Sequence, residues 1–333
     1  MMPVRIGYAS LNQTLRKQGI FVGRTMRLDT IRRRGLSAIH ELALQNLDDL
    51  RRIIIWNEEN GIRFYRMGGD IFPHMENEQI GRELMETYNL DFARDRLAAI
   101  GALARGYGHR LTFHPKQFAQ LGSPRPEVVA RTALDLNVHA GIFSAMGLTP
   151  GIGSVMVIHG GGSYGDKSAT LQRWRDGFRS LPPATRQFVA VENDETQYSP
   201  QDLLPMCEDL DVPLVLDFFH YRCMFPDRYD DLLRDTELLD RISRTWTRRG
   251  IKQKVHLSSQ RAGARRGTHD DYIDVAEMRV ADVLRICERY DADIVCECSQ
   301  KNLCALRILD EFFVREPTGH GRFHWTLINS AHR

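Results

Sequence analysis

Acidic and imidazole side chains stand at the ends of short apolar runs in this chain. The stretch PLVLDFFH, residues 213–220, begins like a buried strand but carries Asp217 and, three positions later, His220. Imidazole and carboxylate groups together are typical ligands of divalent transition-metal ions. The sequence therefore predicts a metal site, and the other candidate ligands at or near the ends of apolar runs are His114, His159, Glu192, His256, His269 and Glu297.

The size of this set predicts more than one metal ion. Five histidines and three carboxylates are available, whereas one ion takes about four to five ligands. With one carboxylate bridging, the set suits two or three divalent cations, and its mixed donors favour Zn, Mn or Fe over Mg or Ca. Three dications would outweigh three carboxylates, so the site would attract a phosphate group. Burying these side chains without a metal or other partners would cost several kcal/mol each, which argues against coincidence.

The elements that must position these residues are strands and helices in alternation. Helix-length segments such as Leu36–Glu59, Val128–Met146 and Leu232–Trp246 separate eight apolar runs. Eight strand–helix repeats predict parallel strands with helical crossovers, and the length suits a closed (β/α)8 TIM barrel, an α/β fold. A doubly wound open sheet is the alternative, but no GxGxxG motif follows the first run. The expected strands are Val4–Tyr8, Ile62–Met67, Arg110–His114, Val155–His159, Phe188–Glu192, Pro213–Phe219, Gln253–Leu257 and Asp293–Cys298.

The length and composition of the chain indicate its domain organisation, its location and the state of its cysteines. We expect one TIM-barrel domain over residues 1–333, with the barrel core at about 4–313, a C-terminal tail at 314–333, and the metal cluster at the carboxyl face of the strands. No apolar run is long enough to span a membrane, so we expect a cytoplasmic protein with no membrane partner. The six cysteines lack CxxC spacing, which favours reduced packing thiols over disulfides or a zinc framework.

Two basic clusters are possible contacts for a polyanion. Eight Lys and Arg residues and no Asp or Glu lie between Arg244 and Arg266, and a second cluster surrounds Arg32–Arg34. The alternative is that both are solvated surface. The glycine-rich stretch HGGGSYGDK, residues 159–167, could bind a phosphate through its amides, form a tight turn, or do both.

Several motifs, in order along the chain, resemble the ultraviolet damage endonucleases. They are GYASLN (7–12), FHPKQF (113–118), IHGGGSYGDK (158–167), VENDE (191–195), LDFFH (216–220), KVHLS (254–258), HDDYI (269–273) and ECSQK (297–301). The resemblance implies a TIM barrel with a trinuclear metal cluster, related in design to the apurinic-site endonucleases of the endonuclease IV type. It implies the same eight metal ligands that the residue pattern predicts.

The resemblance also implies roles for other residues. Lys254 matches a lysine that can be carboxylated and act beside the metals, although a phosphate-binding or solvated lysine is the alternative. Tyr8 and Asn12 match residues at the lesion pocket, and Gln117 and Phe118 match a pair that wedges into the duplex opposite the damage. Phe118 stands where Tyr is more usual, which keeps a stacking face but loses a hydroxyl.

The second-strand loop departs from the family pattern. It reads MGGDIFPHMEN (67–77), with glycines where serines are usual. His74 directly follows Pro73, whereas the family has a histidine a few residues later. The role of His74 is left open.

We therefore expect a metal-dependent DNA repair endonuclease. It would bind damaged double-stranded DNA as a monomer and nick immediately 5′ to pyrimidine dimers and 6-4 photoproducts, with abasic sites as a further substrate. The expected cofactors are two or three divalent ions, manganese first, with zinc or magnesium as alternatives. Glu192 would bridge the ions and Lys254 would assist catalysis. A metal-dependent sugar isomerase or epimerase of the same barrel shape, and an endonuclease IV type enzyme, are the alternative functions.

Overall fold

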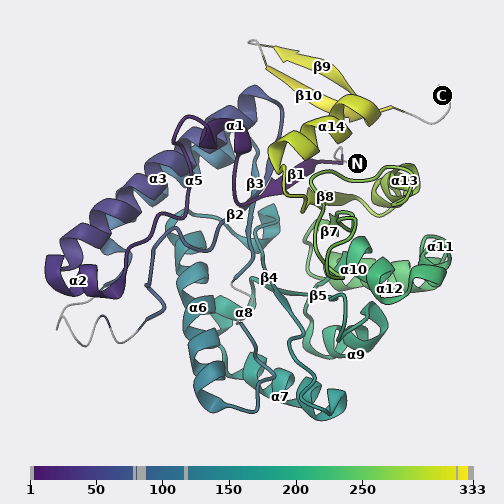
Figure 1. Ribbon diagram of the computed structural model, residues 1–333, viewed down its shortest axis with the longest axis horizontal. Helices are drawn as coiled ribbons and strands as arrows, with labels where there is room; N and C mark the ends of the chain where they lie inside the picture. The colour runs from purple at the N-terminus through teal and green to yellow at the C-terminus, as the bar shows by residue number, and fades with distance from the viewer. Residues whose placement is uncertain (1–3, 78–79, 81–87, 116–118, 320–321, 329–333) are drawn as a thin grey trace.

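Eight short parallel strands form a closed barrel in the order β1 to β8, and β1 pairs with β8 to complete it (Figure 1). The computed structural model describes residues 4–77, 80, 88–115, 119–319 and 322–328. The TIM barrel expected from the sequence is confirmed, with all eight strands. They are β1 (Ile6–Ala9), β2 (Phe64–Met67), β3 (Arg110–Phe113), β4 (Met156–His159), β5 (Val189–Glu192), β6 (Leu214–Asp217), β7 (Gln253–Leu257) and β8 (Ala292–Cys296).

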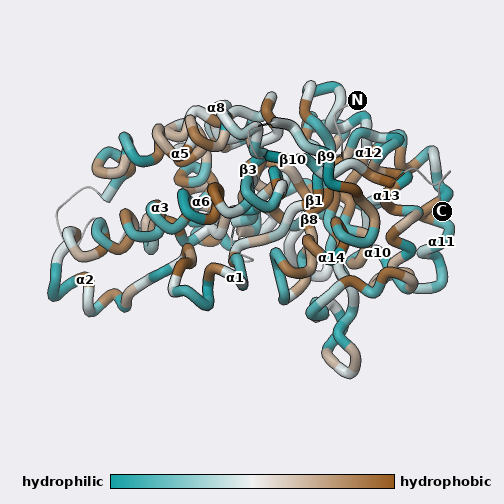
Figure 2. The backbone as a smooth tube through the Cα atoms, turned by 90° about the horizontal axis from the view of Figure 1, so that it is seen from above, coloured by the Kyte–Doolittle hydropathy of each residue, from teal (hydrophilic) through white to brown (hydrophobic). Residues whose placement is uncertain are grey.

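Helices join the strands and surround the barrel, and α2 with the outer part of α3 extends far to one side (Figures 1 and 2). The longest helix, Leu36–Glu59, has the predicted bounds. Among the described residues, each helix is too short or too polar to cross a membrane. The helices are α1 (Gln13–Arg16), α2 (Leu28–Arg34), α3 (Leu36–Glu59), α5 (Arg94–Gly106), α6 (Pro126–Ala145), α7 (Lys167–Ser180), α8 (Pro183–Arg186), α9 (Pro200–Leu210), α10 (Phe218–Met224), α11 (Tyr229–Leu232), α12 (Thr236–Thr247), α13 (Val280–Arg289) and α14 (Asn302–Phe312), with short 3-10 turns at η1 (Asp91–Ala93), η2 (Pro150–Ile152) and η3 (Pro226–Arg228).

Two element boundaries differ from the predicted ones, because capping side chains determine where a helix begins. The sixth strand was expected to reach Phe219 but ends at Asp217, whose side chain accepts the backbone N–H of His220 and caps α10. The predicted helix Leu232–Trp246 is interrupted. Its main part, α12, begins only after Asp235, which accepts the N–H of Leu238 at 3.0 Å. An N-cap carboxylate satisfies a backbone donor that the helix itself leaves unpaired.

The barrel interior is apolar in its middle and ionic at the amino ends of the strands. Successive strand residues point alternately inward and outward, and Val157, Ala190 and Val215 pack together inside. Below them, Arg110 donates to Asp293 at 2.9 Å, and Lys252 lies 2.9 Å from the same carboxylate. Arg110 and Asp293 are almost fully buried, so this ion pair closes the amino end and leaves the carboxyl end for a site.

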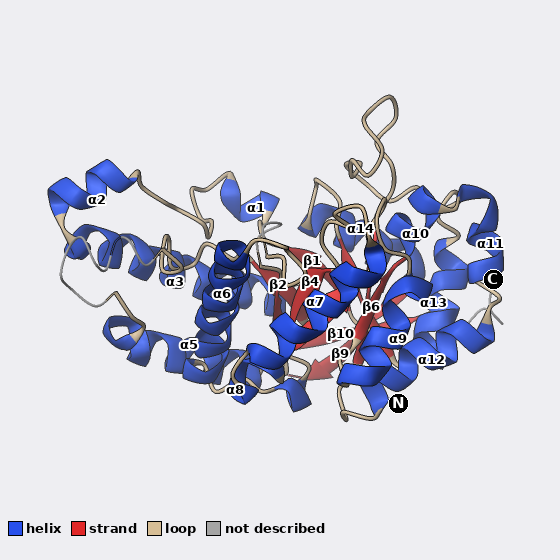
Figure 3. Ribbon diagram, turned by 90° about the horizontal axis from the view of Figure 1, so that it is seen from below, coloured by secondary structure: helices blue, strands red, loops and turns tan. Residues whose placement is uncertain are grey.

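A two-stranded hairpin, β9 (Phe313–Gly319) and β10 (Arg322–Leu327), covers the rim near the amino end of β1 (Figure 3). Trp325 is buried and its indole N–H donates to the carbonyl of Asn60, beyond the end of α3, at 3.0 Å. Arg315 lies 4.6 Å over the Trp325 ring. No strand was expected in the tail after residue 313.

Candidate metal centre

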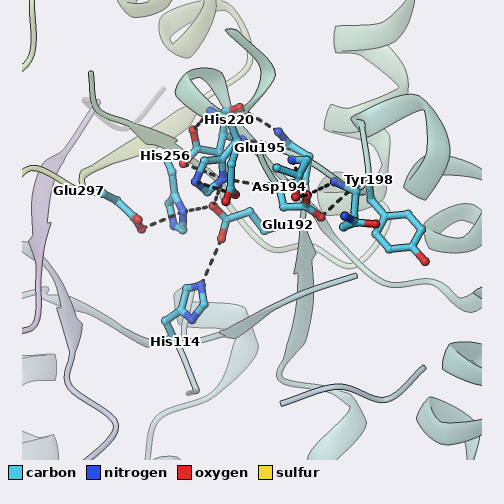
Figure 4. Close-up of polar contacts among 12 residues, drawn as sticks. His114, Glu192, Asp194, Glu195, Tyr198, His220, His256 and Glu297 are labelled. Atoms are coloured by element: carbon cyan, nitrogen blue, oxygen red, sulfur yellow. Dashed lines mark hydrogen bonds and ion pairs between the residues drawn. The ribbon is translucent and has the colours of Figure 1, made fainter. Parts of the chain in front are cut away.

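The carboxyl ends of neighbouring strands bring the predicted ligands level with one another. His159, Glu192 and Asp217 are the last residues of β4, β5 and β6. In the parallel register His159 pairs with Glu192, and Asp217 pairs with His256 in β7. Figure 4 shows that the side chains of neighbouring strands meet in one cluster at this face.

Glu192 lies at the middle of the cluster. Its Oε1 is 2.8 Å from Nδ1 of His256 and 3.5 Å from Nδ1 of His220, while its Oε2 is 3.4 Å from Nε2 of His114. The His159 ring lies 5.0 Å from that of His114 and 5.7 Å from that of His220, centroid to centroid. Burial opposes ionisation, but His256 and His159 hold the pKa of the fully buried Glu192 well below its usual value. One carboxylate therefore contacts imidazoles from three sides.

The local sequence NDETQYS…LDFFH positions Asp217 and His220. Asn193 bridges β5 to β6, because its side chain accepts from the Asp217 N–H at 2.8 Å and donates to the Asp217 carbonyl at 3.0 Å. The Asn193 carbonyl is also 3.0 Å from Nδ1 of His220. A proton held at Nδ1 leaves Nε2 as the free donor atom for a metal. Asn193 therefore orients two candidate ligands at once.

Glu297 follows β8 and faces a guanidinium. Its Oε1 is 3.0 Å from Nδ1 of His256 and pairs with Nη1 of Arg66, which lies on β2. Burial would raise the pKa of Glu297, but Arg66 and His256 hold it well below its usual value. Arg66 was not among the predicted residues. The sequence could have indicated it, because Arg66 lies two residues after the inward-facing Phe64 on the second strand and so points to the same side.

His269 reaches the cluster from a loop after β7. Its ring lies 5.9 Å from the His220 ring and 5.3 Å from the Phe219 ring. A β-bridge between His269 and Gln260 holds the backbone at this point. His269 is thus brought beside His220 by tertiary structure, although it does not end a strand.

The donor atoms fit a metal-binding site. Among the described residues, five buried atoms of the cluster have no hydrogen-bond partner: His159 Nδ1, Glu192 Oε2, Asp217 Oδ2, His256 Nε2 and His269 Nδ1. In two groups of three residues, the possible ligand atoms all lie within 4.8 Å of one another. One group is His114, His159 and Glu192, and the other is Glu192, Asp217 and His256, so the two groups share Glu192. Burial raises the pKa of Asp217 to about 7 and lowers the pKa of His159 to about 3. Cations would satisfy these atoms and offset the cost of burying them.

Lys254 lies below the cluster, two residues before His256 on β7. It is fully buried, and its Nζ has no hydrogen-bond partner among the described residues. Burial, with the charges of Arg66 and Arg110, holds its pKa well below the usual lysine value. Burial therefore favours the neutral amine over the charged ammonium form.

A cleft of about 460 Å³ opens beside His159, between the loops after β4 and β5. The glycine-rich stretch forms one wall with Gly161 and Gly162, and Asp194 and Glu195 lie on the other. Gly161 has φ +88°, a left-handed conformation that favours glycine. Further along the stretch, the Asp166 N–H donates to the Ser163 carbonyl at 3.0 Å, so the stretch contains a tight turn, which was one of its two interpretations.

Tyr8 and Asn12 are fully buried and bond to each other. The Asn12 amide donates to the Tyr8 hydroxyl at 2.9 Å, and that hydroxyl donates to Asn57 of α3 at 2.7 Å. The Asn12 oxygen also accepts the N–H of Leu15 and caps α1. These contacts fix the loop after β1. Their contact with a lesion stays a prediction.

Three further residues were singled out in the sequence, namely Gln117, Phe118 and His74. Gln117 and Phe118 lie outside the described residues. His74 has its Nε2 2.9 Å from the carbonyl of Met26 and 3.3 Å from the hydroxyl of Thr25. Its ring therefore contacts the segment before α2.

The basic run from residue 244 to 266 is divided between the two ends of the barrel. Arg248 binds Asp211 at 2.6 Å, and Arg249 donates to the carbonyl of Gln187, both in loops before strands. Arg261 and the arginines after it lie beyond β7, on the carboxyl side. The run is therefore split between the two ends of the barrel and does not form one surface.

The chain is similar to known proteins over most of its length. The family model described as UV-endonuclease UvdE matches residues 4–318. A protein of Acanthamoeba polyphaga mimivirus is 39% identical over 327 residues, covering 97% of this chain and 96% of its own. The UV DNA damage endonuclease of Bacillus velezensis is 32% identical over 279 residues, 82% of each chain.

Solved structures extend the comparison to the fold. The crystal structure of SacUVDE matches with a TM-score of 0.76 and 25% identity, over 92% of this chain and 98% of that one. Endonuclease IV from Thermus thermophilus shares the fold, with a TM-score of 0.56, 14% identity, and coverage of 79% of this chain and 93% of its own. On the family match and these identities, the chain belongs to the UV-endonuclease UvdE family.

Proposed function

We propose that this protein is a metal-dependent DNA repair endonuclease that nicks duplex DNA immediately 5′ to UV photoproducts, with abasic sites as a further substrate. Family membership supports a DNA repair endonuclease that acts on UV damage. The observation that carries the metal dependence is the position of Glu192, which belongs to both of two adjoining groups of possible ligands. A carboxylate in this position suits ions that lie close together.

The proposed ligands of two or three divalent ions, manganese first, are the predicted eight. Glu192 would bridge, and Asp217, His220, Glu297 and the remaining histidines would complete the set: His114, His159, His256 and His269. When bound, such ions would stabilise negative charge on the phosphodiester and lower the pKa of the attacking water, so that it could lose a proton and act as the nucleophile. The unpartnered buried donor atoms support this assignment.

The chain's own residues would orient the site and limit access to it. Asn193 and Arg66 hold ligand side chains in place. The buried pair of Arg110 and Asp293 closes the amino end, so DNA can approach only from the carboxyl face. His114 is about 15% exposed there and Glu192 about 1%. Because the cluster is recessed, the duplex must bend and its damaged nucleotides must leave the stack, which costs less where pairing is already weakened.

Lys254 would act beside the ions as a carboxylated lysine. A neutral amine can add to CO2, forming an N–C bond and releasing one proton, whereas an ammonium group cannot. The burial of Lys254 and its lowered pKa support the neutral form. The product is an anionic carbamate, which would add a ligand at the bottom of the cluster.

Purified protein with Mn²⁺, incubated with irradiated and unirradiated supercoiled plasmid, tests the proposal. We expect nicking of the irradiated plasmid only, abolished by a chelator and restored by Mn²⁺. A labelled duplex with one thymine dimer should then give a single product that ends just 5′ to the dimer. Equal nicking of both plasmids would indicate a general nuclease, and nicking of neither would contradict the proposed function.

A further inference from the structure

The loop from Gln260 to His269, here called the β7 arm, projects from the carboxyl side of the barrel. Figure 3 shows a loop that stands clear of the molecule on the side of α1 and α10, which follow β1 and β6. The arm starts and ends at the bridge between Gln260 and His269. Within it, the Arg261 N–H donates to the Thr268 carbonyl at 2.8 Å. The arm is therefore a closed hairpin-like projection.

The side chain of Gln260 fills the inside of the arm and sets its shape. Its amide nitrogen donates to the carbonyls of Arg261 and Arg265, both at 3.0 Å. Its oxygen accepts the N–H of Gly267 at 2.9 Å. The amide nitrogen is also 3.4 Å from the carbonyl of Ala264, so one side chain contacts four backbone groups, which preorganises the arm and lowers the entropy cost of binding through it.

The arm carries only positive charge. Arg261, Arg265 and Arg266 lie in it, and it contains no Asp or Glu. Arg261 is held by Asp271 at 3.0 Å, and Arg266 donates to the carbonyl of Cys223. Arg265 is exposed, and among the described residues its side chain has no hydrogen-bond or ion-pair partner.

The tip of the arm is small. It reads Ala262, Gly263, Ala264, and the first two of these are exposed. Small side chains leave room for a backbone phosphate to approach the neighbouring guanidinium. Arginine binds phosphate with two parallel N–H donors, and such contacts position a protein on DNA without reading sequence.

The base of the arm adjoins the candidate metal centre. His269 ends the arm, and its ring lies 5.9 Å from that of His220. A duplex whose phosphodiester reaches the cluster must therefore pass beside the arm. Charge, shape and position favour a nucleic-acid backbone as the partner.

We propose that the β7 arm binds the DNA backbone next to the cleaved phosphodiester, with Arg265 contacting a phosphate and Gln260 holding the arm in shape. The inference rests on the proposed function and deepens it, since it assigns a DNA-contacting element outside the ligand set. The contact is independent of sequence and of damage.

Arg265→Ala tests the contact, with Arg244→Ala as the matched control. Arg244 is also an exposed arginine, but it lies in the last turn of α12, which leads to the amino end of β7. Binding of a fluorescent undamaged duplex is measured by anisotropy over a series of KCl concentrations. For Arg265→Ala we expect Kd to rise about 3- to 10-fold, and the slope of log K against log salt to fall by about 0.9, the value for one phosphate contact. Arg244→Ala should match the wild type, and bound Mn²⁺ should be unchanged in both.

A second variant separates the arm's shape from its charge. Gln260→Ala keeps all three arginines, so it should raise Kd while the salt slope stays closer to that of the wild type. Unchanged Kd and slope in Arg265→Ala, or an equal change in Arg244→Ala, would overturn the proposal. Tighter binding of RNA than of duplex DNA, lost in Arg265→Ala, would also overturn the assignment to DNA. If the wild type nicks no irradiated DNA but the arm variants still change duplex binding, the proposed nuclease function fails while the contact stands.

Discussion

At the scale of single residues, the site depends on neighbours that orient the ligand groups. Asn193 holds Asp217 through two backbone contacts and faces His220 with its own carbonyl. Arg66 occupies the same Glu297 oxygen that lies near His256. Loss of a group that orients a metal ligand typically costs about 10- to 100-fold in metal affinity or activity.

Glu192 is the residue on which both ligand groups depend. We expect Glu192→Gln to fold normally but to bind fewer Mn²⁺ ions per chain and to lose nicking by about 100-fold or more, because the amide cannot supply two anionic oxygens. Elemental analysis, circular dichroism and the plasmid assay measure the three properties. Glu316→Gln, which changes a carboxylate on the distant hairpin, is the control. Full metal content with full activity would rule out the bridging role.

Arg66 should act through Glu297. Replacing it with Met removes the guanidinium that holds the carboxylate, so we expect Mn²⁺ affinity to fall by about 10- to 100-fold, with Arg66→Lys in between. Calorimetric titration with Mn²⁺ measures this without using activity. If Arg66→Met binds Mn²⁺ as the wild type does, the orienting role is wrong.

At the scale of elements, ionic contacts tie the end of α3 to the residues immediately before β2 and β3. Glu58 accepts two bonds from Arg63, each 2.8 Å, and lies 3.2 Å from Nε2 of His109. Burial would raise the pKa of Glu58, but His109 and Arg63 lower it from 4.5 to about 2. The ionised carboxylate is therefore more favourable in the folded protein than in the unfolded chain.

This contact predicts a pH-dependent stability. A lowered folded-state pKa contributes stability that is fully present above the unfolded value of about 4.5 and is lost as pH falls toward 2. We expect Glu58→Gln to lower the free energy of unfolding by roughly 1–2 kcal/mol at pH 7, after allowance for solvent screening. Urea denaturation from pH 7 down to pH 3 should show the difference shrinking below pH 4.5. A difference that stays constant with pH would contradict this origin.

At the scale of the whole molecule, the two ends of the barrel differ in how their buried charged groups are paired. At the amino end Asp293 is paired with both Arg110 and Lys252, whereas at the carboxyl end several buried atoms of the candidate ligands have no hydrogen-bond partner in the described structure. The same division separates the basic residues, since Arg248 and Arg249 are bound near the amino end while Arg265 is exposed in the β7 arm. The residues that stabilise the fold through ion pairs and the residues proposed to bind metal and DNA thus lie at different ends of the barrel.

The closed end predicts a stability effect without a direct effect on the site. Asp293→Ala leaves Arg110 and Lys252 without their shared carboxylate, so we expect a loss of about 3–5 kcal/mol in the free energy of unfolding. Urea unfolding measures it, and Asp293→Asn should lose less because it keeps a hydrogen-bond acceptor. Nicking per folded molecule should be unchanged. A loss below about 1 kcal/mol would show that the ion pair does not stabilise this end.

The sequence by itself determined the order of strands and helices and most of the candidate ligands. Strand ends such as His159, Glu192 and Asp217 could be recognised because polar residues at the end of an apolar run have few structural explanations. A closed parallel barrel then brings such ends to one face whatever their separation along the chain.

Only the tertiary structure decided the contacts between elements. Arg66 meets Glu297 across 231 residues, and Asn193 meets Asp217 across a strand crossover. The basic residues between 244 and 266 are close together in sequence, but β7 lies between the two halves of this run, so they lie at opposite ends of the barrel. Strand periodicity predicts which way a side chain points, but the partner it meets depends on the register and closure of the whole sheet.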